Sequence, residues 1–450
     1  MEKKKVFDRI QYWGQLLLLP IYGLSFLMPR DKDLWLFGST FGRRFADNPR
    51  YLYLYVRRLR IHKDSSDKTD GEKGLSIAGS RAVTRQGSVR PVWISHSKEV
   101  VSFLNARGLE AYHYHSLKGI WLALRAGVYI YDNYSKDINF WQSGGALKVN
   151  LWHGVGNKRI NHDNIHDKVR HPKNLYEKWC TFPRRLSDEK PTDYVLCTSK
   201  EMGAYFEKAF KLKSKHVINA GYPRCDVLCD TDHDLFSVMT PLEQTLKEQL
   251  KAFKKASPKG RIVVYLPTFR ASEKDFLKVM DMEKFNAYLK SRSYLFVIKP
   301  HPKSVLKTAL SGIKGGSLSL SQEAGAKESD GRILIVPDEV DVYTFLGWAD
   351  MLVTDYSSVY TDYMLLDRPV VAFDYDRAEY EKNSRDYFIS QDEYMPELKA
   401  TDMDELMSCM DVAFEKDECL AARQKSRERM FDEPDFNACK RVYEKIRKLL

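Results

Sequence analysis

Apolar and polar positions along this chain alternate as short buried strands separated by amphipathic helices. Apolar strand patterns fall at 34–37, 92–95, 111–115, 128–132, 147–151, 194–198 and 217–221, and then at 262–266, 295–298, 333–336, 351–353 and 370–373. Helical patterns such as 100–106 and 202–210 lie between them. Strands that alternate with helices favour parallel sheets, so an α/β protein is predicted.

Three stretches interrupt this alternation. Residues 62–90 are polar and rich in Ser, Gly, Asp and Lys, which is typical of a flexible insertion. Residues 161–191 are basic and predict a polar, irregular loop, whereas 241–255 form a charged helical pattern suited to a connection. We therefore expect an N-terminal segment at 1–30, Rossmann-like domains at 31–235 and 256–425, and a final helix at 426–450.

The N-terminal segment contains a continuous apolar stretch. Lysines at 3–5 precede apolar residues 12–28, which Gln15 and Pro20 interrupt. The stretch is slightly short for a spanning helix, and no small-residue cleavage site follows it. Three alternatives stay open: an amphipathic helix in the plane of a membrane, a spanning anchor, or a helix buried in the protein.

Charge and cysteine content narrow the class of partner. The chain has 72 basic and 61 acidic residues, a net charge of +11, which fits an anionic partner such as a nucleotide, a polyphosphate or a membrane surface. The basic residues are dispersed and no nucleic-acid-binding module is visible, which disfavours nucleic acid as the partner. Seven cysteines without a CxxC pair indicate reduced thiols rather than disulfides or a zinc site.

The segment 349–376, ADMLVTDYSSVYTDYMLLDRPVVAFDYD, carries the clearest candidate chemistry. Its first strand ends at TDYSS, where a helical pattern begins, and a second strand follows. Ser357 and Ser358 are good N-cap residues, and free N–H groups at a helix start attract phosphate. This βαβ pattern predicts an anion site at the carboxyl edge of the sheet, or else an ordinary capped helix.

Four other motifs precede this segment in a fixed order. They read LWHGVGNKRI at 151–160, GYPRCD at 221–226, VVYLPTFR at 263–270 and FVIKPHPK at 296–303. With TDYSS, they resemble the CDP-glycerol glycerophosphotransferase family of teichoic acid and capsule primases and polymerases; FADNPRYLYLYV is similar to the family's entry segment. The resemblance covers residues 34–380. It implies two Rossmann-like domains facing a cleft, the GT-B-type architecture, whose last helix can cross back to the first domain.

The resemblance also implies a reaction and its principal residues. Glycerol phosphate would pass from CDP-glycerol to a lipid-linked or polymeric acceptor, with release of CMP; CDP-ribitol stays open as the donor. His153 in WHG is expected to be the general base, because an imidazole suits proton transfer near neutral pH. His301 in KPHP is expected to stabilise the β-phosphate or the leaving CMP. Asp226 would orient His153 or bind acceptor hydroxyls.

Further candidates would bind the two substrates. Donor-binding candidates are Arg270, Lys299, Thr354, Ser357, Ser358 and Asp362, and acceptor-binding candidates are Lys158, Arg159 and Arg224. Local alternatives stay open, since Arg224 can form a structural ion pair and Asp362 can cap and pair locally. Cys225 stands where family members often have Asn, and FDEPDFNACKR near the C-terminus lacks the family's glycine.

No metal site or obligatory cofactor is predicted, because His, Arg, Ser and backbone groups are expected to neutralise the donor phosphates; a divalent metal is left open. The GxGxxG and Walker lysine motifs are missing from the sequence, which gives no support for nicotinamide or ATP chemistry. A peripheral enzyme at the cytoplasmic face of the plasma membrane, on an anionic lipid surface, is expected. Homo-oligomerisation stays open. The rival readings are a nucleotide-sugar glycosyltransferase of the same fold and a membrane-peripheral binding protein without turnover.

Overall fold

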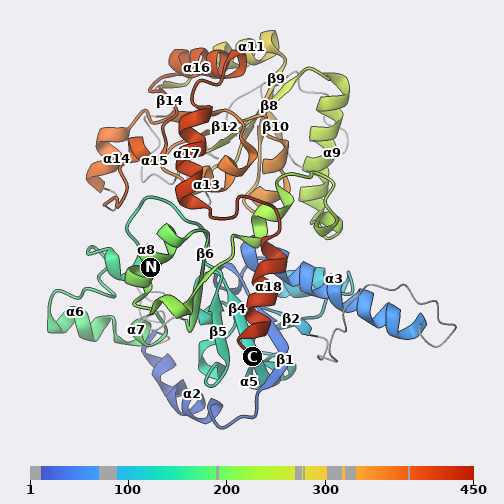
Figure 1. Ribbon diagram of the computed structural model, residues 1–450, viewed down its shortest axis with the longest axis vertical. Coiled ribbons are helices and arrows are strands. Elements are labelled where there is room, and N and C mark those ends of the chain that lie inside the picture. Colours follow the sequence, from blue (N-terminus) through green and yellow to red (C-terminus); the bar gives the residue numbers. More distant parts are fainter. Residues whose placement is uncertain are drawn as a thin grey trace, which may run out of the picture. The chain divides into compact units, whose positions relative to one another are not determined.

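The structure, a computed structural model, describes residues 12–69, 89–188, 192–268, 276, 279–301, 317–319, 331–383 and 386–450, with backbone only at 62–69 and 317–319. The chain forms two compact units (Figure 1). Among the described residues, the first unit holds 12–153, 161–224 and 437–450, and the second holds 154–160 and 225–436. Each unit is built on one parallel sheet, so the predicted α/β class is confirmed.

The sheet of the first unit has seven strands in the order β3-β2-β1-β4-β5-β6-β7. The strands are β1 (Asp31–Phe37), β2 (Arg90–Ser95), β3 (Ala111–His113), β4 (Ala126–Tyr131), β5 (Leu147–Asn150), β6 (Tyr194–Cys197) and β7 (Val217–Asn219). Trp35, Trp93 and Tyr129 are fully buried in it. Such continuous burial is typical of a parallel sheet that is covered on both faces.

Serine caps define where several helices of the first unit begin. The helices α4 (Lys98–Asn105), α5 (Leu117–Arg125) and α8 (Lys200–Phe210) each follow a serine whose Oγ accepts a backbone N–H from the first turn. Each such cap contributes about 1 kcal/mol. The C-terminal helix α18 (Ala438–Lys448) belongs to this unit and packs against α3 (Asp47–Thr69).

The sheet of the second unit has the order β10-β11-β9-β8-β12-β13-β14. The strands are β8 (Arg261–Leu266), β9 (Tyr294–Ile298), β10 (Ser317–Ser319), β11 (Ile333–Ile335), β12 (Met351–Thr354), β13 (Val370–Phe373) and β14 (Leu398–Ala400). Residues of α11 (Met282–Arg292) and α16 (Met403–Glu415) complete a core with one face of this sheet. A capping box between Thr240 and Glu243 opens α9 (Pro241–Ala256).

In both sheets the strand order reverses at one pair of neighbouring strands. The pair is β1 and β4 in the first unit and β8 and β12 in the second. Loops that leave the carboxyl ends of such a pair diverge, and ligands of open α/β sheets bind in the crevice between them. The loops after β4 and after β12 are therefore the natural places to look for function.

Two predictions about irregular stretches were wrong in part. Residues 161–191 contain two helices, α6 (Leu175–Cys180) and α7 (Phe182–Asp188), because Asn174 caps the first one through its side chain. The predicted insertion 62–90 begins later than expected, since α3 continues to Thr69; residues 70–88 lie outside the described part of the chain. The strands β10 and β14 were not predicted.

The N-terminal apolar stretch contains a short 3-10 turn, Gln15–Leu18, followed by the helix α2 (Leu19–Ser25). Two contacts join this stretch to the α6 region of the same unit. Tyr12 Oη donates to the Cys180 carbonyl at 2.9 Å, and the ring centroids of Trp13 and Trp179 lie 4.3 Å apart. Within the described residues, no helix has the length and apolar character needed to cross a membrane.

Candidate active site

The WHG motif forms a tight turn after β5 in the first unit. Trp152 has a left-handed φ of 53° and its N–H is held by Asn150 Oδ1 at 2.8 Å, while Gly154 has a φ of 146°. The indole of Trp152 is buried and packs edge-on against Phe210, with ring centroids 4.9 Å apart. A buried Trp in a strained conformation thus leaves His153 exposed at the carboxyl edge of the sheet.

The ring of His153 is oriented by one backbone oxygen. Its Nδ1 lies 2.9 Å from the carbonyl oxygen of Asp132, the residue that follows β4. A carbonyl oxygen can only accept, so Nδ1 carries the proton and Nε2 of the neutral ring is the acceptor. An imidazole held in this tautomer can take a proton at Nε2.

Asp132 belongs to a buried pair of carboxyl groups at the β1–β4 switch point. Its Oδ1 accepts the Thr40 N–H at 3.0 Å, and Oδ1 of Asp137 accepts the Phe41 N–H at 3.1 Å. Both carboxyls are fully buried, and this burial raises the pKa of Asp132 well above its ordinary value and that of Asp137 to about 6. The two carboxyl groups therefore hold the loop after β1 against the loop after β4, whose Asp132 carbonyl accepts the His153 N–H. In the loop after β1, Thr40 and Phe41 both have positive φ.

The GYPRCD motif spans the boundary between the two units. Arg224 is almost fully buried in the first unit and pairs with Asp47 at 2.8 Å, as the ion-pair alternative expects; acceptor binding by Arg224 stays a prediction. Asp226 is 4% exposed and falls in the second unit. Its proposed contact with His153 therefore stays a prediction.

The residues directly after His153 belong to the second unit. The Val155 carbonyl accepts the Thr361 hydroxyl at 3.0 Å, and Asn157 Nδ2 donates to Gln391 Oε1 at 2.9 Å. Lys158 Nζ lies 2.6 Å from Tyr380 Oη and stands over its ring. The Arg159 N–H donates to the Asp386 carbonyl. The lysine ammonium thus has an aromatic partner in its own unit, and acceptor binding by Lys158 and Arg159 stays a prediction.

The TDYSS segment lies at the switch point of the second sheet, directly after β12. Asp355 is fully buried, and its carboxylate accepts the N–H of Thr268 at 3.0 Å and its hydroxyl at 2.5 Å, which joins the loops after β8 and β12. Thr354 is also fully buried, with its hydroxyl donated to the Leu266 carbonyl at 2.8 Å. The Thr354 side chain therefore bonds β12 to the neighbouring strand β8.

Ser357 and Ser358 are partly exposed beside the helix α13 (Val359–Tyr363). Ser358 occupies the N-cap position, but its side chain makes no capping bond, contrary to the sequence expectation; Ser357 Oγ accepts the Val359 N–H at a long 3.4 Å. The backbone of Ser358 is already helical, with φ −67° and ψ −9°, which is unsuited to side-chain capping. The Ser358 hydroxyl is thus not committed to capping, and the Ser357 hydroxyl makes only this long bond to the helix start.

Asp362 and Lys299 contact neighbouring groups within their unit. Asp362 is fully buried on α13 and accepts the hydroxyl of Tyr343, a residue outside this helix, at 2.5 Å. Lys299 Nζ donates to the carbonyl of Pro337 at 2.7 Å. His301 is half-buried after β9, and Arg270 lies outside the described residues. Donor binding by Arg270, Lys299 and Asp362 stays a prediction, and so does the catalytic role of His301.

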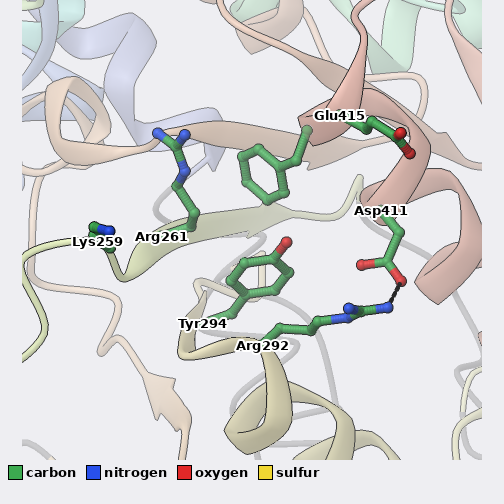
Figure 2. A pocket seen from close by; sticks show the side chains of 7 residues that line it. Lys259, Arg261, Arg292, Tyr294, Asp411 and Glu415 are labelled. Carbon is green, nitrogen blue, oxygen red and sulfur yellow. Dashed lines mark hydrogen bonds and ion pairs between the residues drawn. The ribbon is translucent and has the colours of Figure 1, made fainter.

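A hollow of about 410 Å³ opens elsewhere on the second unit (Figure 2). It is lined by Lys259, Arg261, Arg292, Tyr294, Asp411, Phe414 and Glu415. Arg261 and Tyr294 begin β8 and β9, so the hollow lies at the amino edge of the sheet, opposite TDYSS. Arg292 is paired with Asp411 at 2.7 Å, as Figure 2 shows. Over the described part of the chain, no group of three or more His, Cys, Asp or Glu residues is arranged to hold a metal.

Comparisons with known proteins identify the fold of this chain and its family. The fold matches that of the wall teichoic acid polymerase TagF, a GT-B-like transferase, with a TM-score of 0.67, 17% identity, and coverage of 100% of this chain and 98% of that chain. A TagF structure after a 30 minute soak with CDPG matches with a TM-score of 0.62 and 19% identity over the same shares. The fold class is thus α/β, with two parallel sheets as in that protein.

The family follows from sequence. A family model described as CDP-Glycerol:Poly(glycerophosphate) glycerophosphotransferase matches residues 76–448, and the chain belongs to this family. A teichoic acid poly(glycerol phosphate) polymerase of Bacillus spizizenii is 24% identical over 84% of each chain. A polymerase of the same description from Staphylococcus epidermidis is 22% identical over 80% of this chain but only 43% of its own length. The resemblance drawn from the motifs is confirmed.

Sequence reasoning missed the groups that hold the candidate base. Asn48, Asp132 and Asp137 were not singled out, although Asn48 lies in the FADNPRY segment that carried part of the resemblance. Asp132 directly follows an apolar strand pattern, VYIYD, which places a carboxylate at a strand end. Polar residues at the ends of predicted strands were the available signal.

Proposed function

We propose that this enzyme transfers glycerol phosphate, or a related polyol phosphate, from its CDP-linked donor to a lipid-linked or polymeric acceptor. An acceptor hydroxyl attacks the β-phosphorus of CDP-glycerol. The new bond joins the acceptor oxygen to that phosphorus, and the bond to the bridging oxygen of CMP breaks. His153 Nε2 takes the hydroxyl proton and CMP leaves with the bridging oxygen.

The observation that carries this proposal is the tautomer of His153. Its Nδ1 is committed to the Asp132 carbonyl at 2.9 Å, which leaves Nε2 as an acceptor on an exposed ring. A general base needs a free acceptor nitrogen within reach of the proton that it removes. The turn residue Trp152 and the buried carboxyl pair keep the ring in place before the substrate arrives.

The donor would bind at the switch point of the second sheet. The partly exposed hydroxyls of Ser357 and Ser358 and the imidazole of His301 are the groups we assign to its diphosphate, with Arg270 as a further cation. Asp355 supports this site indirectly, since it ties the loop after β8 to TDYSS through Thr268. Fixed donors of this kind stabilise the negative charge that develops on the phosphate oxygens.

The test compares CMP release from CDP-glycerol and from CDP-ribitol, with a lipid-linked acceptor, for the wild type, His153→Ala and His216→Ala. His216 is a matched control, because its Nδ1 also lies 3.0 Å from an aspartate main-chain oxygen, that of Asp193, but at the amino end of β7. We expect His153→Ala to lower the rate of CMP release by about 10²- to 10⁴-fold, and His216→Ala to leave this rate unchanged. Equal activity of all three proteins would refute the base assignment, and release from neither donor would favour a nucleotide sugar.

We also propose that the first unit docks on an anionic membrane at the cytoplasmic face. Leu17, Leu24 and Leu27 of the N-terminal segment are 83%, 62% and 78% exposed, and on α6 Leu175 and Trp179 are 84% and 59% exposed. The Trp13–Trp179 contact brings the two segments together. Surfaces with this much exposed apolar area mark interaction sites.

Basic residues flank this apolar surface. Lys168, Lys173 and Lys178 are all exposed in or before α6. Lysines beside an apolar face favour anionic lipid, at about 1 kcal/mol for each charge near the surface. Such docking would keep the enzyme beside a lipid-linked acceptor.

Vesicle flotation tests the docking. The wild type should float with vesicles that contain phosphatidylglycerol, and Leu24→Ser combined with Trp179→Ser should weaken this binding about tenfold or more. Val412→Ser is the control, because Val412 is 45% exposed on α16 of the second unit. Equal flotation of the double variant and the wild type would contradict the assigned surface.

A further inference from the structure

One buried side chain, that of Asn48, connects three of the motifs in the first unit. Asn48 is 0% exposed near the start of α3. Its Nδ2 donates to the carbonyls of Trp152 at 2.9 Å and Leu151 at 3.3 Å. Its Oδ1 accepts the Arg224 N–H at 3.2 Å. The amide therefore touches the backbone of both WHG and GYPR.

The carbonyls that Asn48 binds belong to the turn that presents His153. Trp152 has a φ of 53°, a conformation that non-glycine residues rarely adopt unless their surroundings hold them there. Asn150 Oδ1 holds the N–H of Trp152 from one side, and Asn48 holds its carbonyl from the other. The Leu151–Trp152 peptide is thus held at both its N–H and its C=O, and the Trp152–His153 peptide is held at its C=O.

We infer that Asn48 is a positioning residue for the general base, an inference that rests on the proposed role of His153. Asn48 makes no contact with the His153 ring; it holds the Trp152 carbonyl, and so the direction in which the chain enters His153. If that peptide rotates, the ring leaves the Asp132 carbonyl and Nε2 no longer faces the acceptor hydroxyl. A misplacement of about 1 Å costs up to roughly 100-fold in rate.

Asn48→Asp is the sharpest variant because it is isosteric. The carboxylate keeps an acceptor for the Arg224 N–H but cannot donate, and its charge faces two carbonyl oxygens. We expect kcat to fall about 10- to 100-fold, with the KM for CDP-glycerol unchanged, because the donor is assigned to the other unit. An unchanged kcat would overturn the inference.

Asn105→Asp is the matched control. The amide of Asn105 also clamps a backbone turn, donating to the Ala111 carbonyl at 3.0 Å and accepting its N–H at 3.1 Å, but it joins the last residue of α4 to the first of β3. This variant should keep the wild-type kcat. An equal fall in both variants would mean that any lost amide clamp impairs the enzyme, and the inference would fail.

A double-mutant cycle separates positioning from a merely structural role. In a His153→Ala background, Asn48→Asp should lower the residual CMP release no further, because the group that it positions has been removed. A further fall by the same factor as in the wild type would overturn the inference. If His153→Ala itself keeps full activity, the proposed base is wrong, and that outcome is distinct from a failure of Asn48 alone.

Asn48→Ala provides a second variant if Asn48→Asp does not fold. It removes both donors without adding charge, and the same loss of kcat at constant KM is expected. If both variants lose their cooperative thermal transition, Asn48 is needed for the fold rather than for the base, and the inference is overturned.

Discussion

Arg423 lies at the centre of a buried ion-pair network in the second unit, and its replacement offers a demanding test of the structure. Its guanidinium makes two bonds to Glu397, at 2.7 and 2.9 Å, and two to Asp417, at 2.8 and 2.9 Å. The side chains of Arg423 and Glu397 are 0% exposed. Tyr360 on α13 donates its hydroxyl to Glu397 at 2.9 Å, so the network also supports the helix after TDYSS.

Arg423→Met removes one partner and leaves the Glu397 carboxylate buried. The expected loss is about 3–5 kcal/mol in the free energy of unfolding of this unit, because an unpaired charge is then desolvated. In a unit of this size, each kcal/mol lowers the melting temperature by about 2–4 °C, so a fall of about 6–20 °C is expected. Urea unfolding, monitored by hydrogen exchange of the peptides that contain α13 and α17 (Leu420–Met430), would measure the loss in free energy of unfolding.

Two companion variants define what would refute this reasoning. Arg429→Met, on the same helix, removes a pair with Glu393 that is 33% and 57% exposed, and should cost at most about 1 kcal/mol. Adding Glu397→Gln to Arg423→Met should recover part of the loss, since the unpaired charge is then gone. A loss of less than 1 kcal/mol for Arg423→Met, or equal losses for Arg423→Met and Arg429→Met, would show that the network is not buried as described.

For Arg423→Met we also predict how the loss of stability changes with pH. Burial raises the pKa of Glu397 and Arg423 lowers it, so without Arg423 the folded-state pKa rises further above its unfolded value. A group with a raised folded-state pKa binds its proton more tightly in the folded state, and stability falls as pH rises through that pKa. Arg423→Met should therefore be less destabilised, relative to the wild type, at pH 5 than at pH 8.

Three further outcomes are expected. Because burial raises the pKa of Asp137 to about 6, the stability of the first unit should fall as pH rises through that value, and Asp137→Asn should flatten this dependence in melting curves from pH 4 to 8. A Cβ added to Gly156 would lie 3.3 Å from Ser358 Cβ, so Gly156→Ala should displace that serine and raise the KM for CDP-glycerol. Lys158→Met should lower stability by about 1–2 kcal/mol, because its ammonium leaves the Tyr380 ring and hydroxyl, as urea unfolding would measure.

Each of these outcomes has a control or a contrary result. Gly203→Ala on α8, in which the new Cβ has an ordinary 3.4 Å contact with Cys197 Sγ, should leave KM unchanged; a matching rise there would make the Gly156 result non-specific. A steeper pH dependence in Asp137→Asn would contradict the raised pKa. An unchanged urea midpoint for Lys158→Met would mean that its aromatic contact contributes nothing.

The strands and the motif order could be predicted from the sequence because both are local patterns. Val149 and Val353, for example, lie in apolar runs of the length that a buried parallel strand requires. The helix α6 was missed because Leu175, Tyr176 and Trp179 are mostly exposed, so its apolar residues do not mark a face that packs on the core.

The positions of the site residues depended on contacts that no local pattern contains. The motifs did not show that Arg224 pairs with Asp47 or that Asp362 accepts the Tyr343 hydroxyl, because these partners lie 177 and 19 positions away in sequence. Asn48 lies 104 positions from Trp152, and only the folded chain brings its amide to that carbonyl. Long-range polar partners of this kind are invisible to periodicity and spacing.

The placement of α18 has a consequence for how the protein is synthesised. Cys439, Val442 and Ile446 of this helix are buried in the first unit, although they follow the whole second unit in sequence. Domains usually fold as they leave the ribosome, the N-terminal one first. Here the sheet that carries His153 emerges early, but α3 lacks its α18 partner until residues 437–450 have been translated. The second unit can therefore fold before the first is complete, and the apolar residues that α18 covers stay exposed during that interval.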